Sequence, residues 1–294
     1  MTFRCGTIAV IGRPNVGKST LLNHLVGARI SITSRKPQTT RHAIRGILNT
    51  DDAQFIFVDT PGFQRRHGGS LNKALNARVE ATVGESDVCL FLLALGSLNS
   101  ADRDIWPIAQ RARVCVIGVN RIDEPDNPRD RVLEFLPRVA STFGGPDIVP
   151  ISARTGRNVD ELIKVLSKHL PEQPPMFGPD DITDRDERFL AAELVREKLF
   201  RALGDEVPYG SIVGIDEFKI EGALRRIQCT IYLDRDGHKP IVLGHEGARL
   251  KAIASAARRD MESLFGGKVY LNVWIKVRSG WSDDPASLRR FGLN

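Results

Sequence analysis

One short stretch near the N-terminus restricts the possible folds more than any other part of this sequence. Residues 12–19 read Gly-Arg-Pro-Asn-Val-Gly-Lys-Ser and match the pattern G-x-x-x-x-G-K-[ST]. An apolar run at 7–11 precedes this stretch, and an amphipathic helical pattern at 20–26 follows it. Such glycines let backbone N–H groups surround phosphate groups at the N-terminus of a helix. We therefore expect a phosphate-binding loop; the alternative, a glycine-rich turn with a chance lysine, is disfavoured by the flanking patterns.

The first 170 residues alternate between buried strands and helices. Nearly continuous apolar runs at 7–11, 54–59, 88–93, 114–120 and 147–152 are typical of parallel strands that are covered on both faces. Helical patterns lie between these runs, for example at 71–84 and 159–169. The alternation predicts an α/β fold with a doubly wound parallel sheet, in which ligands bind at the carboxyl ends of the strands.

A proline-rich segment separates this part from a second, smaller domain. Residues 171–179 contain four prolines, which neither a helix nor a central strand accommodates. We predict a first domain at 1–170, a linker at 171–184 and a second domain at 185–294 with its core near 204–280. A helix at 185–203, strands at 212–220 and 226–233, a helix at 248–265 and a strand at 268–277 predict an α+β order. The length of 294 residues suits two domains.

Composition argues against several other classes of protein. Hydrophobic residues make up 41% and charged residues 27% of the chain, as in globular proteins rather than disordered ones. No apolar run approaches the roughly 18 residues of a membrane span, and the N-terminus lacks the apolar segment of a signal peptide, so we expect a cytoplasmic protein. The four cysteines stand singly, which disfavours a disulfide framework or a zinc site. A net charge of +6 permits a polyanionic partner but identifies none.

Asp59-Thr-Pro-Gly62 ends the strand at 54–59 and suits a magnesium site beside the phosphate loop. We expect Ser19 and Asp59 to hold Mg²⁺, Lys18 to reach the β- and γ-phosphates, and the Gly62 amide to sense the γ-phosphate. A hydroxyl from the segment before this strand would complete the Mg²⁺ coordination. We favour Thr40 over Thr39 for this role, within a first switch segment formed by Gln38, Thr39, Thr40, Arg41 and His42. The residues expected to act in catalysis are Lys18, Thr40 and Gly62.

Hydrolysis faces an obstacle after Gly62. Many small GTP-hydrolysing proteins place a water-orienting glutamine directly after this glycine, but this chain has Phe63, and Gln64 comes one position late. A phenyl ring can neither donate to nor accept from the attacking water. We therefore expect slow intrinsic hydrolysis, with the water held by backbone groups or by an element that a partner orders.

Two further motifs at strand ends indicate a guanine base. Asn120-Arg-Ile-Asp123 follows the strand at 114–120, and the Asp123 carboxylate can accept from both N1–H and the exocyclic amine of guanine. Adenine offers neither donor in that arrangement and would leave the carboxylate unpaired. Ser152-Ala-Arg154 follows the last strand, where the Ala153 N–H can meet guanine O6. The full expected nucleotide-binding set is Gly12, Arg13, Pro14, Asn15, Val16, Gly17, Lys18, Ser19, Thr20, Asp59, Thr60, Pro61, Gly62, Phe63, Asn120, Arg121, Ile122, Asp123, Ser152, Ala153 and Arg154.

The second domain contains a Gly-x-x-Gly loop at 244–247. An apolar run at 241–243, which we expect to be a strand, precedes the loop, and the helix at 248–265 follows it. KH modules clamp about four single-stranded nucleotides with such a loop. A plain turn is the alternative, but the order of the surrounding elements fits a type II KH fold. The expected RNA-binding residues are Ile241, Val242, Gly244, His245, Glu246, Gly247, Arg249, Lys251, Arg258 and Arg259, with Ile253 also lining the base groove.

The phosphate loop resembles that of the translation-factor-type GTPases, G-x-P-N-V-G-K-S. The chain departs from their usual motifs in that Arg121 and Arg154 stand where lysine is commoner, and Glu246 stands where KH loops often carry a basic residue. In related GTPases an asparagine at the position of Asn15 helps to hold a K⁺ ion. The resemblance therefore implies Mg²⁺, and also K⁺, as cofactors.

Over essentially its whole length the chain resembles the bacterial Era family. The resemblance rests on S-R-K-P-Q-T-T-R-H at 34–42, D-T-P-G at 59–62, D-I-T-D at 181–184, the KH loop and W-I-K-V-R-S-G-W at 274–281. It implies a GTPase that binds the 3′ end of 16S ribosomal RNA (rRNA) through its KH domain and acts in assembly of the small (30S) ribosomal subunit. It also implies a cytoplasmic monomer with peripheral association at the inner membrane.

The resemblance leads to a hypothesis about switching. GTP would order the loop around Thr40 and the segment after Asp59, and would thereby expose the RNA groove of the KH domain. Two alternatives are a metabolic phosphotransferase with a phosphate loop, and a GTPase of tRNA modification or membrane function whose second domain docks a protein. The Asn120-x-x-Asp123 motif opposes the first alternative.

Overall fold

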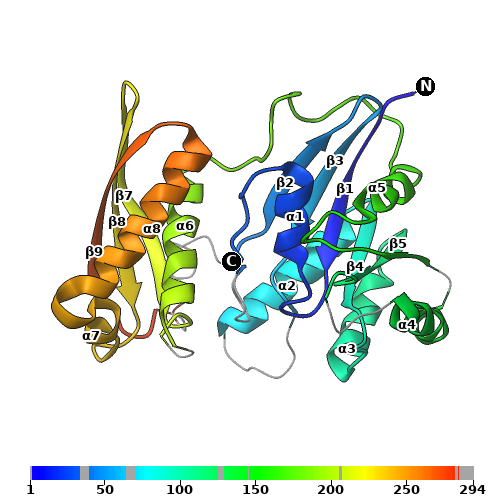
Figure 1. Cartoon of the computed structure of the whole chain (residues 1–294), viewed down its shortest axis with the longest axis horizontal. Coiled ribbons are helices and arrows are strands. Elements are labelled where there is room, and N and C mark those ends of the chain that lie inside the picture. Colours follow the sequence, from blue (N-terminus) through cyan, green and yellow to red (C-terminus); the bar gives the residue numbers. More distant parts are fainter. Residues whose placement is uncertain are drawn as a thin grey trace. The chain divides into compact units, whose positions relative to one another are not determined.

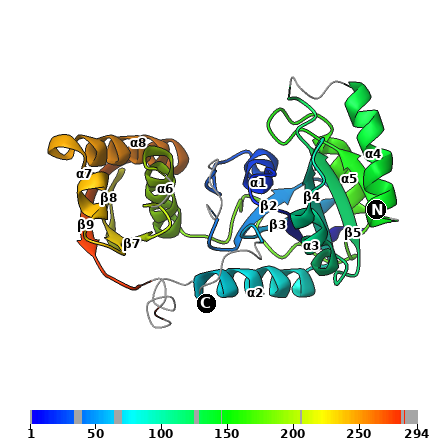
Figure 2. The same ribbon diagram turned by 90° about the horizontal axis from the view of Figure 1, so that it is seen from below.

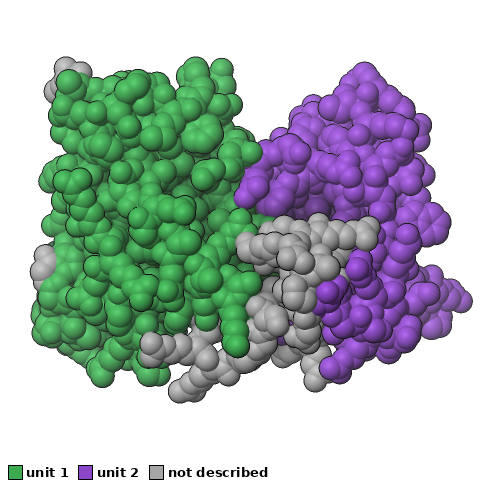
Figure 3. All heavy atoms as spheres, turned by 180° about the vertical axis from the view of Figure 1, so that it is seen from behind, with its two compact units in different colours: residues 1–31, 40–68, 72–184 green, residues 32–39, 69–71, 185–294 purple. Residues whose placement is uncertain are grey.

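The structure is a computed structural model that describes residues 2–33, 40–63, 70–124, 129–144, 146–204, 207–281 and 284. It contains two compact units (Figure 3). Unit 1 comprises Met1–Ser31, Thr40–Gly68 and Asn72–Asp184, and unit 2 comprises Ile32–Thr39, Gly69–Leu71 and Arg185–Asn294. Among the described residues, no helix is both long and apolar enough to cross a lipid bilayer.

Unit 1 is built on a six-stranded sheet with the order β2-β3-β1-β4-β5-β6 (Figure 1). Its elements are β1 (Arg4–Ile11), α1 (Lys18–Val26), β2 (Ile44–Asn49), β3 (Ala53–Asp59), α2 (Ser70–Glu85), β4 (Val88–Ala94), α3 (Ser100–Ala109), β5 (Cys115–Asn120), α4 (Arg129–Phe143), β6 (Asp147–Pro150) and α5 (Val159–Ser167). All neighbouring strands are parallel except β2, which pairs antiparallel with β3. The doubly wound fold that the sequence predicted is therefore confirmed.

The antiparallel edge strand β2 is the one strand of this sheet that sequence reasoning missed. Its burial alternates poorly, because only part of the strand faces the core. A tight connection at Thr50–Asp52 joins it to β3, where the Thr50 hydroxyl donates to the carbonyl oxygen of Ala53 at 3.0 Å. A hairpin strand at a sheet edge lacks the continuous apolar run by which buried parallel strands are recognised.

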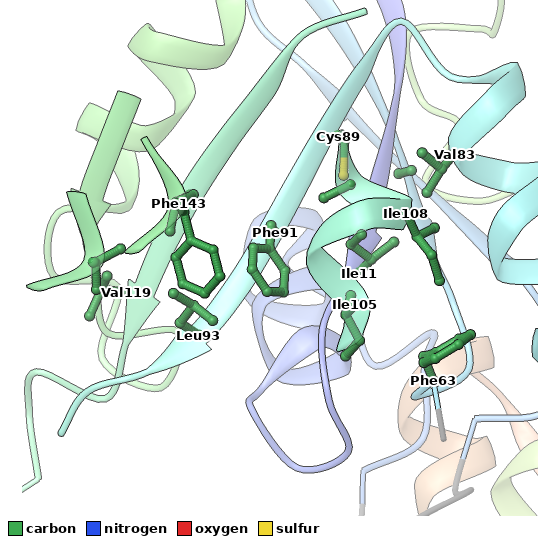
Figure 4. Packing of buried hydrophobic residues seen from close by; sticks show 14 of the residues in the cluster. Ile11, Phe63, Val83, Cys89, Phe91, Leu93, Ile105, Ile108, Val119 and Phe143 are labelled. Atoms are coloured by element: carbon green, nitrogen blue, oxygen red, sulfur yellow. The ribbon is translucent and has the colours of Figure 1, made fainter. Parts of the chain in front are cut away.

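Helices cover both faces of the sheet in unit 1. On one face, α2, α3 and α4 pack against the strands through a cluster that includes Phe91 and Phe143 (Figure 4). The rings of Phe91 and Phe143 meet edge to face, with centroids 5.6 Å apart, and Trp106 packs against both. On the opposite face lie α1 and α5 (Figure 2). Helices therefore shield both faces of the sheet from water, and a polar ligand can reach the sheet at the strand ends.

β1 lies between β3 and β4 in this sheet, although it comes first along the chain. The connections that follow β1 and β3 therefore run to opposite sides of the sheet, and the loop after β1 opens at the crossover. In open α/β sheets this crossover point is where ligands bind. The loop that carries Gly12 to Ser19 begins at this point.

Residues 171–184 pack along the sheet edge of unit 1. The N–H of Ile47 in β2 donates to the carbonyl oxygen of Ile182 at 3.0 Å, and Gly46 forms an antiparallel bridge with Thr183. The side chain of Gln54, which is fully buried, accepts from the N–H groups of Met176 and Phe177 at 2.8 and 2.9 Å. This proline-rich segment is therefore held as an extension of the sheet edge.

Unit 2 has a three-stranded sheet with the order β7-β8-β9. Its elements are α6 (Glu187–Ala202), β7 (Ser211–Glu221), β8 (Leu224–Leu233), α7 (His238–Leu243), a 3₁₀ turn at His245–Gly247, α8 (Ala248–Phe265) and β9 (Lys268–Val277). β7 and β8 are antiparallel, whereas β8 and β9 are parallel. Helices α6 and α8 lie on one side of this sheet (Figure 2), and their apolar residues form a core with Ile227, Ile231 and Val269.

Candidate functional site

The loop after β1 has a backbone that only glycine accommodates at two positions. Gly12 and Gly17 have φ angles of +150° and +105°. A Cβ atom at Gly12 would lie 2.5 Å from the carbonyl oxygen of Leu92, and one at Gly17 would lie 2.2 Å from Nδ2 of Asn120. Helix α1 begins directly after Gly17, and no side chain caps this N-terminus. Its first N–H groups, together with the helix dipole, therefore form an anion-binding site.

Lys18 lies at the centre of this loop. Its ammonium group donates to the carbonyl oxygens of Gly12 and Arg13 at 2.9 and 3.1 Å, so its long side chain folds back over the loop. Burial lowers the pKa of Lys18 to about 8, although the nearby Asp59 carboxylate opposes this effect. A buried cation in the loop that leads into the uncapped N-terminus of α1 is suited to receive phosphate oxygens.

Asp59 joins the two expected metal-binding hydroxyls at the end of β3. The Ser19 hydroxyl donates to Oδ2 of Asp59 at 2.6 Å and lies 3.1 Å from the Thr40 hydroxyl. The Ser31 hydroxyl also donates to this oxygen at 2.7 Å. Burial raises the pKa of Asp59, while Lys18 and the hydroxyl hydrogen bonds lower it. Sequence reasoning missed Ser31, because a serine in a connecting loop carries no signal of such a distant contact.

The chemistry of this cluster fits a divalent cation. Oδ1 of Asp59 is buried without a hydrogen-bond partner among the described residues. A buried carboxylate oxygen with no donor is costly unless a cation or ordered water satisfies it. Two hydroxyls and a carboxylate are oxygen ligands of the kind that Mg²⁺ prefers.

Asn120 at the end of β5 connects two loops. Its Nδ2 group donates to the carbonyl oxygen of Val16 at 2.7 Å. Its Oδ1 atom accepts from the N–H groups of Arg121 and Ala153 at 2.8 and 2.9 Å. The Ala153 N–H, which we expected at guanine O6, is therefore engaged with Asn120 in this structure. The physical reason is that the two loops meet closely enough for Asn120 to satisfy a buried N–H that would otherwise lack a partner.

Asp123 is held in place by Arg154. The side chain of Asp123 is 11% exposed, and its Oδ2 atom accepts from Nε and Nη2 of Arg154 at 2.8 and 2.6 Å. Burial alone would raise the pKa of this carboxyl, but hydrogen bonds from Ser152 and Arg154 outweigh it and lower the pKa. Asp123 is thus an oriented, ionised acceptor at the strand end.

Several other residues of the expected set play supporting roles. Arg121 adopts a left-handed conformation, and its guanidinium donates to the carbonyl oxygen of Asn15 in the phosphate loop. Arg13 points to Asp102 at the start of α3, 3.2 Å away. The Thr60 hydroxyl donates to the carbonyl oxygen of Val10 at 2.9 Å. Val16, Phe63 and Ile122 are buried, and their side chains offer no polar group to a ligand.

Thr40, Arg41 and His42 of the expected switch segment are among the described residues. Thr40 is 7% exposed and Arg41 is fully buried. Gln38, Thr39 and Gln64 lie outside the described residues. Phe63 packs in the apolar cluster of Figure 4, which agrees with its inability to orient a water molecule.

The Gly-x-x-Gly loop of unit 2 connects α7 to α8. Gly244 and Gly247 have φ angles of +70° and +77°, and Glu246 between them is also left-handed. A Cβ atom at Gly244 would lie 2.8 Å from that of Arg249, whereas one at Gly247 would meet open space. His245, Glu246 and Arg249 are exposed. No side chain caps α8 at Gly247, so the loop presents N–H groups as the phosphate loop does.

Two expectations for this loop are corrected by the structure. The apolar run at 241–243 is the end of helix α7, not a strand. A run of three apolar residues does not distinguish the two, and Pro240 is compatible with the first turn of a helix. Val242 and Ile253 are buried in the core of unit 2, so they cannot line an exposed groove. Ile241, by contrast, is 42% exposed.

Comparison with known proteins agrees with both units. The family model described as "50S ribosome-binding GTPase" matches residues 7–121, and the model described as "KH domain" matches residues 206–282. The fold and the site therefore define a GTPase with a KH domain, and the chain hydrolyses GTP.

Relatives that align with this chain over its full length identify the family within the GTPases. The proteins called GTPase Era from Chromobacterium violaceum and Nitrosomonas eutropha are 49% and 50% identical to this chain, and each alignment covers 99% of this chain and 98% of the relative. A crystal structure of Era with MgGDPNP and nucleotides 1506–1542 of 16S rRNA has a TM-score of 0.94 and 37% identity, with 99% of each chain covered. An Aquifex aeolicus Era variant bound to GDP and AlF₄⁻ also has a TM-score of 0.94, with 38% identity and 99% of each chain covered. This chain belongs to the Era family, as the sequence indicated.

Proposed function

We propose that this GTPase binds the single-stranded 3′ end of 16S rRNA through unit 2 and acts in assembly of the 30S subunit. The observation that carries the proposal is the exposed, uncapped Gly244–Gly247 loop at the start of α8. The related Era structure contains nucleotides from the 3′ region of 16S rRNA, which supports the same ligand here. Lys251 and Arg259 are exposed on α8 and add positive charge after the loop.

A pair of glycine substitutions tests this proposal. Gly247→Asp places a carboxylate where phosphate would bind, and we expect binding of a 16S 3′-end oligonucleotide to be abolished while GTP affinity is kept. Gly222→Asp is the matched control, because Gly222 has a φ angle of +60° and equal open space around a Cβ atom. Loss of both RNA and GTP binding would indicate misfolding. Unchanged RNA binding by Gly247→Asp would contradict the proposal.

For the nucleotide site, we propose that Asp123 reads guanine, that Lys18 and the phosphate-loop N–H groups bind the phosphates, and that Gly62 senses the γ-phosphate. Ser19, Thr40 and Asp59 would hold Mg²⁺, which when bound neutralises charge on the β- and γ-phosphates. The related structure with MgGDPNP supports this cofactor. Asp123→Asn should shift the preference from guanine toward xanthine nucleotides, measured by competition binding. Unchanged discrimination would refute the role of Asp123.

A K⁺ ion at Asn15 is a further part of the proposal. It would supply positive charge near the phosphates and thus compensate in part for the absent glutamine after Gly62. We expect faster GTP hydrolysis in KCl than in NaCl at equal ionic strength, and we expect Asn15→Ala to remove this difference. Equal rates of the unmodified protein in both salts would exclude a role for K⁺.

The coupling of nucleotide to RNA is proposed to run through the chain after α1. The Ser31 hydroxyl donates to Asp59, as described above. Two residues later the chain belongs to unit 2, where the N–H of Thr33 donates to Glu197 of α6 at 3.2 Å. Ser31 and Thr40 flank the connection that contains Thr33, and both lie in the hydroxyl cluster around Asp59. GTP-dependent ordering of this cluster would therefore act on the connection from both sides. Equal affinity of the GTP and GDP forms for the 16S oligonucleotide would exclude this switch.

A cytoplasmic monomer with peripheral association at the inner membrane completes the proposal. The net charge of +6 supports attraction to anionic lipid headgroups. Flotation with anionic vesicles, compared with neutral ones, tests the membrane association, and sedimentation tests the monomer. Equal flotation with both vesicle types would contradict an electrostatic contact.

A further inference from the structure

Strand β9 presents a row of exposed aromatic and basic side chains on the face of the sheet opposite the helices. Alternate residues of the strand pack toward the core of unit 2, so the other set faces outward. We call this set the β9 outer row; its members are Lys268, Tyr270, Asn272, Trp274 and Lys276. Because β9 is at the edge of the sheet, the row has one neighbouring strand, β8, in the part of the chain that the structure describes.

Two large aromatic rings in this row are unusually open to solvent. Tyr270 is 51% exposed and Trp274 is 57% exposed. The chain has three tyrosines and three tryptophans in all, and one of each is exposed on this single strand. Exposed large apolar groups that lie together on a surface often mark an interaction site. The guanidinium of Arg226 on β8 lies over the Tyr270 ring, 5.3 Å from its centre, and this cation–π contact helps to orient the ring.

The charges around the row favour a polyanion. Lys268 and Lys276 stand at its two ends, both exposed, and the row contains no acidic residue. Among the described residues of the sheet, the acidic groups on this face belong to β7 and are engaged: Glu221 pairs with Arg226 at 2.9 Å, and Glu217 pairs with Lys219. Asp216 accepts from the Thr230 hydroxyl at 2.6 Å. A ligand along β9 therefore meets positive charge at both ends.

We propose that the β9 outer row is a second nucleic-acid surface that takes unpaired bases of single-stranded RNA. Bases would stack on Tyr270 and Trp274, and the lysines at the ends would contact phosphates. The two rings are four residues apart, which is about 13 Å along a strand, so each ring receives its own base. The inference concerns a different face from the Gly244–Gly247 loop and depends on the proposed function only for the choice of RNA as ligand.

Oligonucleotide length separates the two surfaces. The KH loop clamps about four nucleotides, so a four-nucleotide RNA probes the loop alone, whereas a twelve-nucleotide RNA can also reach the row. We expect Tyr270→Ala with Trp274→Ala to weaken binding of the longer RNA at least tenfold and to leave the shorter one unchanged. Trp274→Phe, which keeps a ring, should retain most of the affinity. Ile220→Ala is the control, because Ile220 is 63% exposed and lies outside the row.

Tryptophan fluorescence gives a direct measure of the contact. Trp281 is fully buried and Trp106 is partly buried, so acrylamide should quench Trp274 most strongly. The twelve-nucleotide RNA should shield Trp274 from acrylamide, and the four-nucleotide RNA should not.

The outcomes distinguish this inference from the proposed function. If Gly247→Asp weakens binding of the long RNA while the aromatic variants and the quenching are unchanged, the row is not an RNA surface and the KH loop stands. If the aromatic variants weaken binding and Gly247→Asp does not, the row is supported and the loop fails. If neither RNA binds the intact protein, both proposals are overturned.

Discussion

The Asn120 side chain makes hydrogen bonds to three backbone groups in unit 1, and its removal should destabilise this unit. Asn120→Ala would leave the carbonyl oxygen of Val16 and the N–H of Ala153 without their partners, at 2.7 and 2.9 Å in the structure. Each buried polar group left unsatisfied costs about 1–3 kcal/mol. We therefore expect the free energy of unfolding of unit 1 to fall by about 2–6 kcal/mol, with a matching loss of GDP affinity as the phosphate loop loses its support.

Urea denaturation read by hydrogen exchange and mass spectrometry on peptides from β1 and β5 measures unit 1 alone. Thr142→Ala is the control, because it removes an exposed side-chain hydrogen bond to Arg138 at 2.7 Å in the same unit. Such surface changes stay within about 0.5 kcal/mol. If Asn120→Ala costs no more than Thr142→Ala, the bracing role assigned to Asn120 is wrong.

Three further predictions concern buried groups. Burial lowers the pKa of Lys18 to about 8, so the folded protein loses this proton at a lower pH than the unfolded chain does, and the free energy of unfolding should rise with pH above 8. Over the same range the unmodified protein should lose its advantage in GDP affinity over Lys18→Gln. Binding titrations in which the ratio of the two affinities stays constant with pH would contradict this. Ser31→Ala removes a hydrogen bond to the buried Asp59 carboxylate and should cost unit 1 about 1.5–3 kcal/mol in the same urea assay; no loss would show that the bond is not needed. Iodoacetamide should modify Cys115, the one partly exposed cysteine, before the buried Cys89 and Cys229, because contact with Cys115 and burial raise the pKa of Cys89 and burial raises that of Cys229 to about 12; modification of either buried thiol first, detected by peptide mass spectrometry, would contradict this.

The sequence was most informative where chemistry coincides with strand ends. Gly12, Asp59 and Asp123 could be placed in one site because parallel strands bring their carboxyl ends to the same edge of the sheet. The glycines were interpretable because two of them adopt backbone angles that other residues avoid. These signals are local in sequence, and the fold makes them neighbours in space.

Contacts that depend on side chains from unrelated loops could not be foreseen. Ser31 reaches Asp59, and Ala153 donates to Asn120 rather than projecting a free N–H, because of how the loops meet. Nor could the burial of Val242 be inferred, since an apolar residue beside a binding loop suits either the groove or the core. The edge strand β2 lacked a continuous apolar run, and its partner segment at 171–184 is recognisable from prolines but not from pairing.

That pairing matters to anyone who divides this protein. An exposed strand edge offers open N–H and C=O groups to other chains and promotes aggregation. Cutting after residue 170 would uncover Gly46 and Ile47 and would strip Gln54 of the N–H groups that it accepts from, whereas cutting after Asp184 keeps the protective strip. The proline-rich segment, which composition alone would assign to a spacer, therefore covers a strand edge that a shortened unit 1 would expose.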